Sequence, residues 1–360
     1  MKAGVLRNNR MIVDEMAEPV AGPRHVLCDV KSCGICGTDL HTIAFGDVIV
    51  RAFNERPASE PGDELGYSAL DFGRDIVLGH EFCAEVVDLG ADVNNVSVGD
   101  LLVSVPAIID AAGGHGLGFS NLYPGGFAQR MVLSTDLALK VPNGLPHHLA
   151  ALTEPATVGE HTVDLAAVAQ GDGALVLGAG PVGLMIVASL ARRGVSPIVV
   201  SEPAAGRRAM ATKLGAHLVV DPTADDPIAV WHASAARRQP LAIFEAVGVP
   251  GMLDAAIRMA PPWSRLIVAG ICCEADTVFP ARAFRSELNI QFVGMYSPAD
   301  FAATLRLLAE GALRIEPIAT GAVGIDGLPA ACQQLATPHD HAKVLVQPGL
   351  GAAAIVGLGS

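Results

Sequence analysis

The second half of the chain alternates short apolar runs with amphipathic stretches. The apolar runs have the length of strands and lie at Ala174–Leu177, Pro197–Ser201, His217–Val220, Leu241–Ala246, Arg265–Ala269 and Asn289–Gly294. Between them, stretches such as Val182–Arg193 and Ala204–Leu214 are rich in Ala, Leu and Arg and predict helices. This alternation is typical of βαβ units, so it predicts a doubly wound α/β domain whose parallel sheet has helices on both faces.

The first part of the chain shows a different pattern. Short β-rich runs are separated by Gly, Pro and Asp turns, as at Val26–Lys31, Glu81–Leu89 and Asp100–Val105. These runs predict a partly antiparallel β domain, to which a helix at Ser297–Glu310 and a last strand at Ala342–Gln347 are expected to return. We therefore predict a β-rich domain from residues 1–152 and 296–360, and a doubly wound domain from residues 153–295.

Composition narrows the classes of protein that fit. The chain has 360 residues, of which 51% are hydrophobic and 17% charged, which is enough for two cores and argues against disorder. A formal charge of −13 argues against nucleic acid or an anionic membrane as partner. Seven cysteines do not suggest a disulfide framework, and no secretory signal opens the chain, so we expect a cytoplasmic protein. The apolar stretch Gly173–Ala191 contains glycines and a proline, which argues against a membrane span.

A glycine-rich fingerprint follows the first apolar run of the second half. In Val176–Gly183, Gly178 permits a tight turn, Gly180 lets a pyrophosphate approach the backbone, and Gly183 lets helix and strand pack closely. The helix begins at Pro181 and Val182, and its free N–H groups would face the phosphates. The sequence therefore predicts a dinucleotide site.

Cofactor choice is indicated by Glu202, which ends the second strand of this domain. A carboxylate there can accept hydrogen bonds from the adenosine ribose and repels a 2′-phosphate, which favours NAD over NADP. Arg207 and Arg208 offer the opposite possibility, because an arginine can pair with that phosphate.

Candidate metal ligands occur in the first half and at the junction of the two domains. Gly34–His41 contains Cys36, Gly79–Glu81 contains His80, and Glu154 lies between Thr153 and Pro155. Cysteine and histidine are the ligands that zinc prefers, and a carboxylate can complete a tetrahedron. An alternative reading of Cys33 and Cys36 is a redox CxxC pair, but the region lacks the βαβ context of such pairs.

Together these segments resemble the zinc-containing alcohol dehydrogenases of the medium-chain dehydrogenase/reductase family. Val98–Asp100 and Gly125–Ala128 also match, and the motifs occur in the family's order over nearly the whole chain. The resemblance implies a GroES-like catalytic domain beside a Rossmann domain, and a homodimer or homotetramer.

The resemblance also implies the ligands of a catalytic zinc. Cys36 and His80 would bind the metal, and Glu154 matches a position filled by Cys in the simple alcohol dehydrogenases and by Glu in the polyol and butanediol branches. Glu81 matches the acidic residue that can exchange with water at the metal.

The same resemblance gives roles to three residues beside the metal. Thr38 would hydrogen-bond the substrate hydroxyl, and Asp39 would orient His80. His41 would pass the proton to solvent.

Two segments depart from the family pattern. Pro106–Pro124 replaces a lobe with four cysteines and contains none, so we expect one catalytic zinc per chain and no structural zinc. The long segment Ala44–Leu78 is expected to shape substrate access, with Phe45, Phe53, Tyr67 and Phe72 as apolar lining.

These expectations define an oxidoreductase that transfers hydride between NAD and a secondary alcohol, which is a diol, a polyol or a cyclic alcohol. The alternatives are an NADP-linked carbonyl reductase of the same family and a catalytically silent nucleotide-binding protein.

For several other cysteine and histidine residues, a structural role explains the sequence as well as or better than a functional one. We expect Cys33 and Cys83 to be small buried residues and Cys272 and Cys273 to be apolar lining, and His161 fits a core position as well as the site.

Overall fold

The computed structural model describes residues 1–54, 70–111, 113–169, 171–234, 240–337 and 339–358. Its contacts divide the chain into two compact units. Unit 1 comprises Met1–Glu154 and Ala319–Ser360, and unit 2 comprises Pro155–Ile318. Residues 296–318 thus fall in unit 2, whereas the sequence pattern suggested that they return to the β-rich domain. The domain boundaries stay a prediction.

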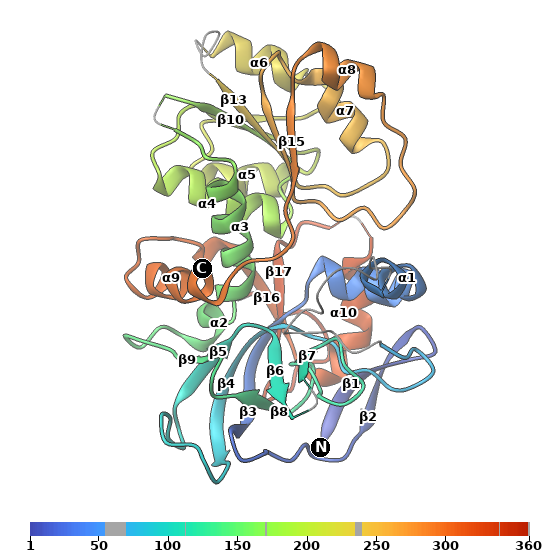
Figure 1. Ribbon diagram of the computed structural model, residues 1–360, viewed down its shortest axis with the longest axis vertical. Coiled ribbons are helices and arrows are strands. Elements are labelled where there is room, and N and C mark those ends of the chain that lie inside the picture. Colours follow the sequence, from blue (N-terminus) through green and yellow to red (C-terminus); the bar gives the residue numbers. More distant parts are fainter. Residues whose placement is uncertain (55–69, 112, 170, 235–239, 338, 359–360) are drawn as a thin grey trace. The chain divides into compact units, whose positions relative to one another are not determined.

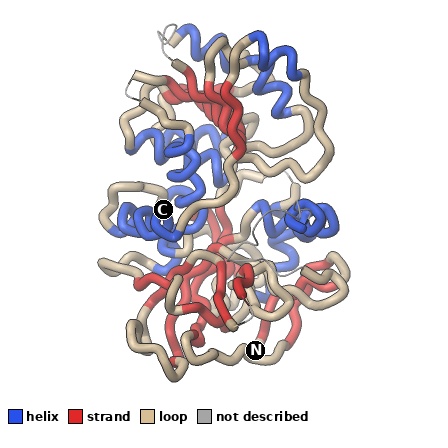
Figure 2. The backbone as a smooth tube through the Cα atoms, viewed as in Figure 1, coloured by secondary structure: helices blue, strands red, loops and turns tan. Residues whose placement is uncertain are grey.

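Unit 1 is built mainly from strands joined by loops (Figure 2). Its strands are β1 (Lys2–Arg7), β2 (Arg10–Glu15), β3 (His25–Gly34), β4 (Glu81–Leu89), β5 (Leu101–Ser104), β6 (Ala107–Asp110), β7 (Gly113–Gly116), β8 (Arg130–Ser134), β9 (Ala138–Lys140), β16 (Ala319–Val323) and β17 (Lys343–Val346). Its helices are α1 (Gly37–Asn54), α2 (His147–Ala150), η2 (Ile325–Gly327) and α10 (Leu328–Leu335), and α3 (Thr153–Leu165) begins here.

The main sheet of unit 1 has the strand order β16-β17-β3-β4-β5-β9, and β8 also pairs with β3. Strand β3 is antiparallel to β4, β8 and β17. Its last residue, Gly34, lies opposite Glu81 of β4 and opposite Leu345 of β17. Three segments that are far apart in the sequence therefore meet where β3 ends.

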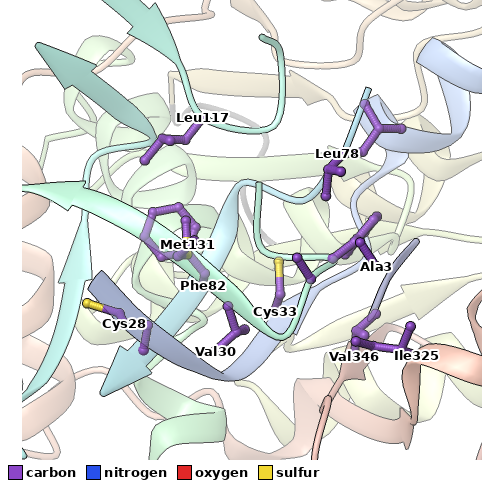
Figure 3. Packing of buried hydrophobic residues seen from close by; sticks show 14 of the residues in the cluster. Ala3, Cys28, Val30, Cys33, Leu78, Phe82, Leu117, Met131, Ile325 and Val346 are labelled. Atoms are coloured by element: carbon purple, nitrogen blue, oxygen red, sulfur yellow. The ribbon is translucent and has the colours of Figure 1, made fainter. Parts of the chain in front are cut away.

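One face of this sheet packs into an apolar core (Figure 3). Cys28 and Val30 are alternate residues of β3 and contribute to the core, as does Cys33 beyond a register shift in the strand. Phe82 and Met131 come from neighbouring strands. Cys33 and Cys83 are completely buried, which confirms the expectation for both. The apolar alternation along the first part of β3 explains why one of its faces packs into the core.

Unit 2 contains a parallel sheet of the predicted type. Its strands are β10 (Gly173–Leu177), β11 (Ile198–Ser201), β12 (Leu218–Val220), β13 (Leu241–Glu245), β14 (Arg265–Val268) and β15 (Asn289–Phe292). Their order is β12-β11-β10-β13-β14-β15, and all neighbours are parallel. Each strand overlaps a run predicted from the sequence, so the α/β fold class is confirmed.

Helices cover both faces of this sheet (Figure 1). Helices α4 (Pro181–Arg192) and α5 (Ala205–Lys213) lie on one side, and α6 (Pro227–Ala233), α7 (Met252–Met259) and α8 (Pro280–Arg285) on the other. Unit 2 also contains most of α3, α9 (Pro298–Ala309) and the short η1 (Glu316–Ile318). The strand order reverses between β10 and β13, and ligands of such sheets bind at that point, outside the carboxyl ends of the strands.

Two further features complete the fold. The C-terminal segment runs beside β16, where Val356 forms an antiparallel bridge with Ala322. Among the described residues, no helix combines the length and apolarity that crossing a membrane requires.

Candidate metal centre and dinucleotide site

Cys36 lies in the short turn between β3 and α1. Asp39, in the first turn of α1, accepts a hydrogen bond at Oδ2 from the backbone N–H of Cys36 at 2.9 Å. A carboxylate in this first turn also suits the positive end of the helix. Asp39 is completely buried, so its charge has to be balanced by the groups around it.

Asp39 and Gly79 position His80 close to Cys36. Oδ1 of Asp39 accepts a hydrogen bond from the Gly79 N–H at 3.2 Å and lies 3.4 Å from Nδ1 of His80. Gly79 has a φ of +96°, and a Cβ there would lie 2.6 Å from the ring of Phe127, so a side chain is not tolerated. A carboxylate beside one ring nitrogen is the usual way in which a ligating histidine is oriented.

Glu81 follows at the start of β4, opposite Gly34. A Cβ on Gly34 would lie 1.9 Å from Oε2 of Glu81, so the glycine makes room for the carboxylate. Oε1 accepts a hydrogen bond from Nζ of Lys343 at 2.6 Å. Oε2 is buried and has no hydrogen-bond partner among the described residues.

These residues form a compact set of donors. One ligand atom each from Cys36, His80 and Glu81 lie within 4.8 Å of one another, and no other such group was found in the described part of the chain. Sulfur, imidazole nitrogen and carboxylate oxygen are the donors that zinc prefers. The buried Oε2 without a partner is unusual in a folded protein and suits a site that receives a cation. The residues present therefore fit a zinc ion.

The electrostatics of the donors agree with this fit. Burial disfavours the charged form of His80, but the negative charges of Asp39 and Cys36 outweigh it and raise the pKa of His80 well above its usual value. A metal ion would compete with this proton for the histidine, so zinc affinity should fall as the pH falls.

Glu154 lies in the first turn of α3 and is buried, with 8% of its surface exposed. It is not one of the three residues in the compact set. Its charge is nevertheless among those that raise the pKa of Lys343, as are the charges of Glu81 and Cys36. Glu154 therefore belongs to the same electrostatic environment.

The residues expected to handle the proton lie on α1. Oγ1 of Thr38 is 3.6 Å from Sγ of Cys36. His41 lies one turn further along and packs edge-on against Phe45, with ring centroids 6.3 Å apart. Burial lowers the pKa of His41, which favours the neutral imidazole.

The segment Ala44–Leu78 begins as helix, because α1 continues to Asn54. The ring of Phe72 packs where Gly46 leaves space on this helix. The expectations for Phe53 and Tyr67 as lining lie outside the described side chains.

The glycine-rich fingerprint of unit 2 forms the loop between β10 and α4. Gly178 has a φ of +91°, and a Cβ on Gly183 would lie 2.1 Å from the carbonyl oxygen of Gly178. A Cβ on Gly180, in contrast, would meet nothing within 4 Å among the described atoms. Packing thus requires glycine at the first and third positions. The second, followed by Pro181 and Val182 in the first turn of α4, leaves its backbone open to a ligand.

Glu202 follows strand β11 and is 5% exposed. Its Oε2 accepts a hydrogen bond from the N–H of Ala179 at 2.8 Å, and its Oε1 accepts one from the N–H of Ala204 at 2.9 Å. Arg208 donates to the Glu202 and Pro203 carbonyls, each at 2.7 Å, and lies 3.1 Å from Asp221. Glu202 therefore ties the fingerprint loop to its own strand end, a role that the sequence did not predict. Arg207 lies beside it on α5 and is partly buried.

Other residues named from the sequence lie elsewhere. Nδ1 of His161 is 3.4 Å from Asp300 in unit 2, which gives this histidine a partner there. Cys272 is exposed and Cys273 partly buried. Cys33 and Cys36 are both free thiols, and burial raises the pKa of Cys33 well above its usual value, which disfavours the redox reading.

Two residues beside the candidate metal centre were not predicted from the sequence. Lys343 is completely buried beside Glu81, and a lysine inside the apolar run Ala342–Gln347 was the available signal. Phe119 packs on His80, with ring centroids 5.1 Å apart, and nothing in its sequence context marked it.

Family models match both parts of the chain. Residues 22–143 match the alcohol dehydrogenase GroES-like domain, and residues 181–310 match the zinc-binding dehydrogenase family. The chain is 30% identical to (R,R)-butanediol dehydrogenase of Bacillus subtilis, over 97% of this chain and all of that protein. It is 25% identical to the sorbitol dehydrogenase of the same organism, over 97% of each chain.

Solved structures of related dehydrogenases have the same fold as this chain. The crystal structure of 2R,3R-butanediol dehydrogenase from Bacillus subtilis superposes with a TM-score of 0.80 at 28% identity, over 97% of this chain and 99% of that one. A putative zinc-binding dehydrogenase from Sinorhizobium meliloti, bound to NADP, gives a TM-score of 0.77 at 25% identity, over 96% and 99%. The fold and the site thus define a zinc-binding oxidoreductase with a nicotinamide cofactor. The chain belongs to the zinc-containing alcohol dehydrogenases of the medium-chain dehydrogenase/reductase family.

Proposed function

We propose that the protein oxidises a secondary hydroxyl group of a diol, polyol or cyclic alcohol to a ketone with NAD, or catalyses the reverse reduction. The observation that carries this proposal is the buried set of Cys36, His80 and Glu81, whose ligand atoms lie within 4.8 Å of one another. The names of the relatives, butanediol and sorbitol dehydrogenases, support the substrate class.

Cys36, His80 and Glu154 would hold one zinc ion, with Glu81 beside them as an exchangeable ligand. When bound, zinc supplies Lewis-acid chemistry that lowers the pKa of a substrate hydroxyl. Asp39 keeps His80 in place through its contact with Nδ1.

Residues of α1 would move the substrate proton. Thr38, whose Oγ1 lies 3.6 Å from the Cys36 sulfur, is close enough to accept a hydrogen bond from a hydroxyl group at the site. His41 is largely neutral near pH 7 because burial lowers its pKa, so it can take up a proton and release it to solvent.

We infer NAD as the cofactor. The pyrophosphate would lie on the N–H groups of Val182 and Gly183 in the first turn of α4, because the N–H of Ala179 is already engaged by Glu202. Glu202 keeps a buried negative charge at the end of β11, where a 2′-phosphate would be repelled. Arg208 is engaged by Asp221 and by backbone carbonyls, which weakens the case for an NADP site. Arg207 remains the residue through which NADP would be accepted.

We infer one zinc per chain. Within Pro106–Pro124, the hairpin of β6 and β7 is held by Asp110, which accepts a hydrogen bond from Tyr123 OH at 2.7 Å and lies 3.1 Å from Nε2 of His115. These contacts occupy the place of the cysteine-rich lobe seen in the family and support a lobe that folds without metal.

We infer a homodimer, or a homotetramer built from such dimers. Strand β15 is the edge of the parallel sheet, and apolar side chains on it and near it are exposed: Phe279, Phe284, Phe292 and Met295. An apolar edge of this kind is usually covered in a stable protein.

All seven cysteines are free, which supports a reducing, cytoplasmic location.

The test combines metal analysis with a substrate screen. Purified protein should contain one zinc per chain and should reduce NAD with diols, polyols, cyclic alcohols or terpenoid alcohols. Turnover with NADP and carbonyl compounds alone would favour the carbonyl reductase. No turnover with any alcohol or ketone, in a protein that still binds nucleotide, would favour the silent nucleotide-binding protein.

A further inference from the structure

Unit 1 contains a polar pocket outside the two candidate sites. Its volume is about 700 Å³, which lies within the usual range of small-molecule sites, and its walls come from β3, β8, α2 and the segment after β17. Asp29 lines the pocket and alternates along β3 with the buried Cys28 and Val30, so the pocket lies on the face of β3 opposite the core. Among the described residues that line it there is no candidate zinc ligand.

A chain of three hydrogen-bonded side chains forms one part of this pocket. Nε2 of Gln347, just after β17, donates to Oγ of Ser32 at 3.2 Å, and the same Oγ lies 2.8 Å from Nδ1 of His147 in α2. Ser32 is completely buried, and a buried hydroxyl group needs an acceptor. The amide nitrogen of Gln347 can only donate, so the hydroxyl proton of Ser32 goes to Nδ1 of His147.

This chain fixes what His147 and Gln347 present to the pocket that they line. Burial lowers the pKa of His147, and the nearby His148 and Lys31 lower it further, so the imidazole is neutral near pH 7. A neutral imidazole that accepts at Nδ1 carries its proton on Nε2, which makes His147 a donor there. Gln347 keeps its carbonyl oxygen as an acceptor.

Two more lining side chains are held in the same manner. Oε1 of Gln129 accepts a hydrogen bond from the backbone N–H of Lys2 at 2.8 Å, which leaves the NH₂ group of Gln129 as a donor. Oδ1 of Asp29 accepts one from Nε of Arg130 at 2.8 Å, which leaves Oδ2 as an acceptor. The described part of the pocket thus offers both donors and acceptors on side chains whose other ends are fixed by the protein. Such preorganised groups bind a ligand at a low cost in conformational entropy.

The charged groups of the pocket are already paired. Arg130 contacts both Asp29 and Glu18, and Nζ of Lys31 lies 3.0 Å from Glu85. An anion such as phosphate would have to displace a carboxylate from one of these cations, and a cation would have to compete with Arg130 for its carboxylates. A neutral ligand with several hydroxyl groups needs neither change, because each hydroxyl can donate to a carboxylate and accept from an amide or imidazole N–H.

We propose that this pocket is a second binding site, for a neutral polyhydroxylated compound such as a polyol or a sugar. Its hydroxyl groups bond to the four oriented side chains, and Pro348 and Leu350 supply apolar surface for its carbon atoms. The inference does not depend on the proposed zinc site, because the two share no residue.

The experiment measures the binding of sorbitol and of maltose to the full chain that carries Cys36→Ser. That substitution removes a candidate zinc ligand and so prevents a polyol from binding through the metal. Ligand-observed NMR titrations should give a dissociation constant of roughly 1 mM for sorbitol, as the usual binding energy per ligand atom gives for a six-carbon polyol.

Two substitutions in this background test the pocket itself. Gln129 is exposed, so Gln129→Leu should fold normally and weaken binding by about fivefold, the usual value of one neutral hydrogen bond. Gln347→Leu should weaken binding by at least ~10-fold, because it removes an acceptor and also releases Ser32 and His147. If Gln347→Leu does not fold, Gln129→Leu carries the test alone. Gln333 is an exposed glutamine of α10 in the same unit, so Gln333→Leu is the matched control and should leave binding unchanged.

Three outcomes would overturn the proposal. The first is no binding of either compound at concentrations about 50-fold above the expected dissociation constant. The second is binding that Gln129→Leu does not weaken, and the third is tighter binding of inorganic phosphate than of sorbitol and maltose. A chain that binds sorbitol in this pocket but neither holds zinc nor oxidises any alcohol would instead overturn the proposed function and leave this inference intact.

Discussion

Buried carboxylates occur at both candidate sites, but the two compact units satisfy them in different ways. In unit 1, Glu81 is balanced by the ammonium group of Lys343, which lies 262 positions away in the sequence. In unit 2, Glu202 accepts hydrogen bonds from the backbone N–H groups of Ala179 and Ala204, and Glu245 from those of Val247 and Gly248.

Buried carboxylates therefore serve two different functions in this protein: some fix the shape of a loop, and others create a place for a cation. Glu202 and Glu245 of unit 2 fix the shapes of loops that follow parallel strands, and they do so without any cation. The acidic groups of unit 1 lie with a thiolate and a histidine around a place where a positive charge is required. Substitutions around the candidate metal centre should therefore change metal binding, whereas those at the loop carboxylates of unit 2 should change stability and, for Glu202, cofactor choice.

The largest expected effect concerns the metal ligands themselves. Cys36→Ser and His80→Ala should lose zinc and turnover together, because removing one of few ligands opens the site. We expect kcat to fall by about a thousandfold or more, which is roughly 4 kcal/mol of transition-state stabilisation. Elemental analysis and steady-state kinetics measure both. The exposed Cys272 provides a control, since Cys272→Ser should change neither. Normal zinc content in Cys36→Ser would refute the assignment.

The sequence predicted these ligands but not their surroundings, for a physical reason. The strands of unit 2 and the turn around Cys36 depend on local patterns, namely apolar runs, glycines and a carboxylate in a first helical turn. Lys343 and Phe119 reach the site only through the pairing of distant strands and the packing of a loop, which no local pattern encodes. The two backbone hydrogen bonds of Glu202 were missed because its position after a strand suggested only a ribose contact.

The next effect concerns cofactor choice. The protein should have a higher kcat/KM with NAD than with NADP, and Glu202→Gln should reduce that ratio by about 30-fold. This corresponds to the ~2 kcal/mol of a charge-assisted hydrogen bond. Kinetics with both cofactors measure the ratio.

Glu245→Gln is the matched control for this change. Glu245 is 2% exposed and also accepts two backbone hydrogen bonds, so its substitution should lower stability by a similar amount and leave the ratio unchanged. An unmodified protein that prefers NADP would mean that Arg207 decides the cofactor.

A smaller effect is expected for substrate choice. Glu154 in the place of a cysteine points to secondary alcohols, and Phe119 and Phe45 supply apolar surface beside His80 and His41. Ethanol should therefore be poorer than 2,3-butanediol or cyclohexanol by at least ~10-fold in kcat/KM, about the value of one lost apolar contact. Steady-state rates on the three alcohols decide this. If ethanol were the best substrate, the inference from Glu154 to secondary alcohols would be wrong.

The smallest expected effect concerns Glu160, a carboxylate of unit 2 that is balanced by cations, unlike Glu202 and Glu245. Its contribution to the free energy of unfolding should depend on pH. Glu160 on α3 is buried and accepts hydrogen bonds from Arg192 at 3.1 Å and from Arg193 at 2.8 Å. Burial raises the pKa of Glu160, but the two arginines outweigh it, so the pKa is lower than that of a free glutamate. A lowered pKa in the folded state means that the stabilisation is complete above the unfolded pKa of about 4.3 and is lost as the pH falls through the folded value.

Glu160→Gln should therefore lower the free energy of unfolding at pH 7 by about 1 kcal/mol, the difference between a charge-assisted and a neutral hydrogen bond. The variant and the unmodified chain should converge once the pH falls below the lowered folded-state pKa of Glu160, where this carboxyl group is protonated in both the folded and the unfolded state. Urea unfolding of the full chain at several pH values measures this. Asp164 also pairs with Arg193, but its side chain is 57% exposed, so Asp164→Asn should change stability much less. A difference between Glu160→Gln and the unmodified chain that does not depend on pH would show that packing, and not the charge of Glu160, stabilises this part of unit 2.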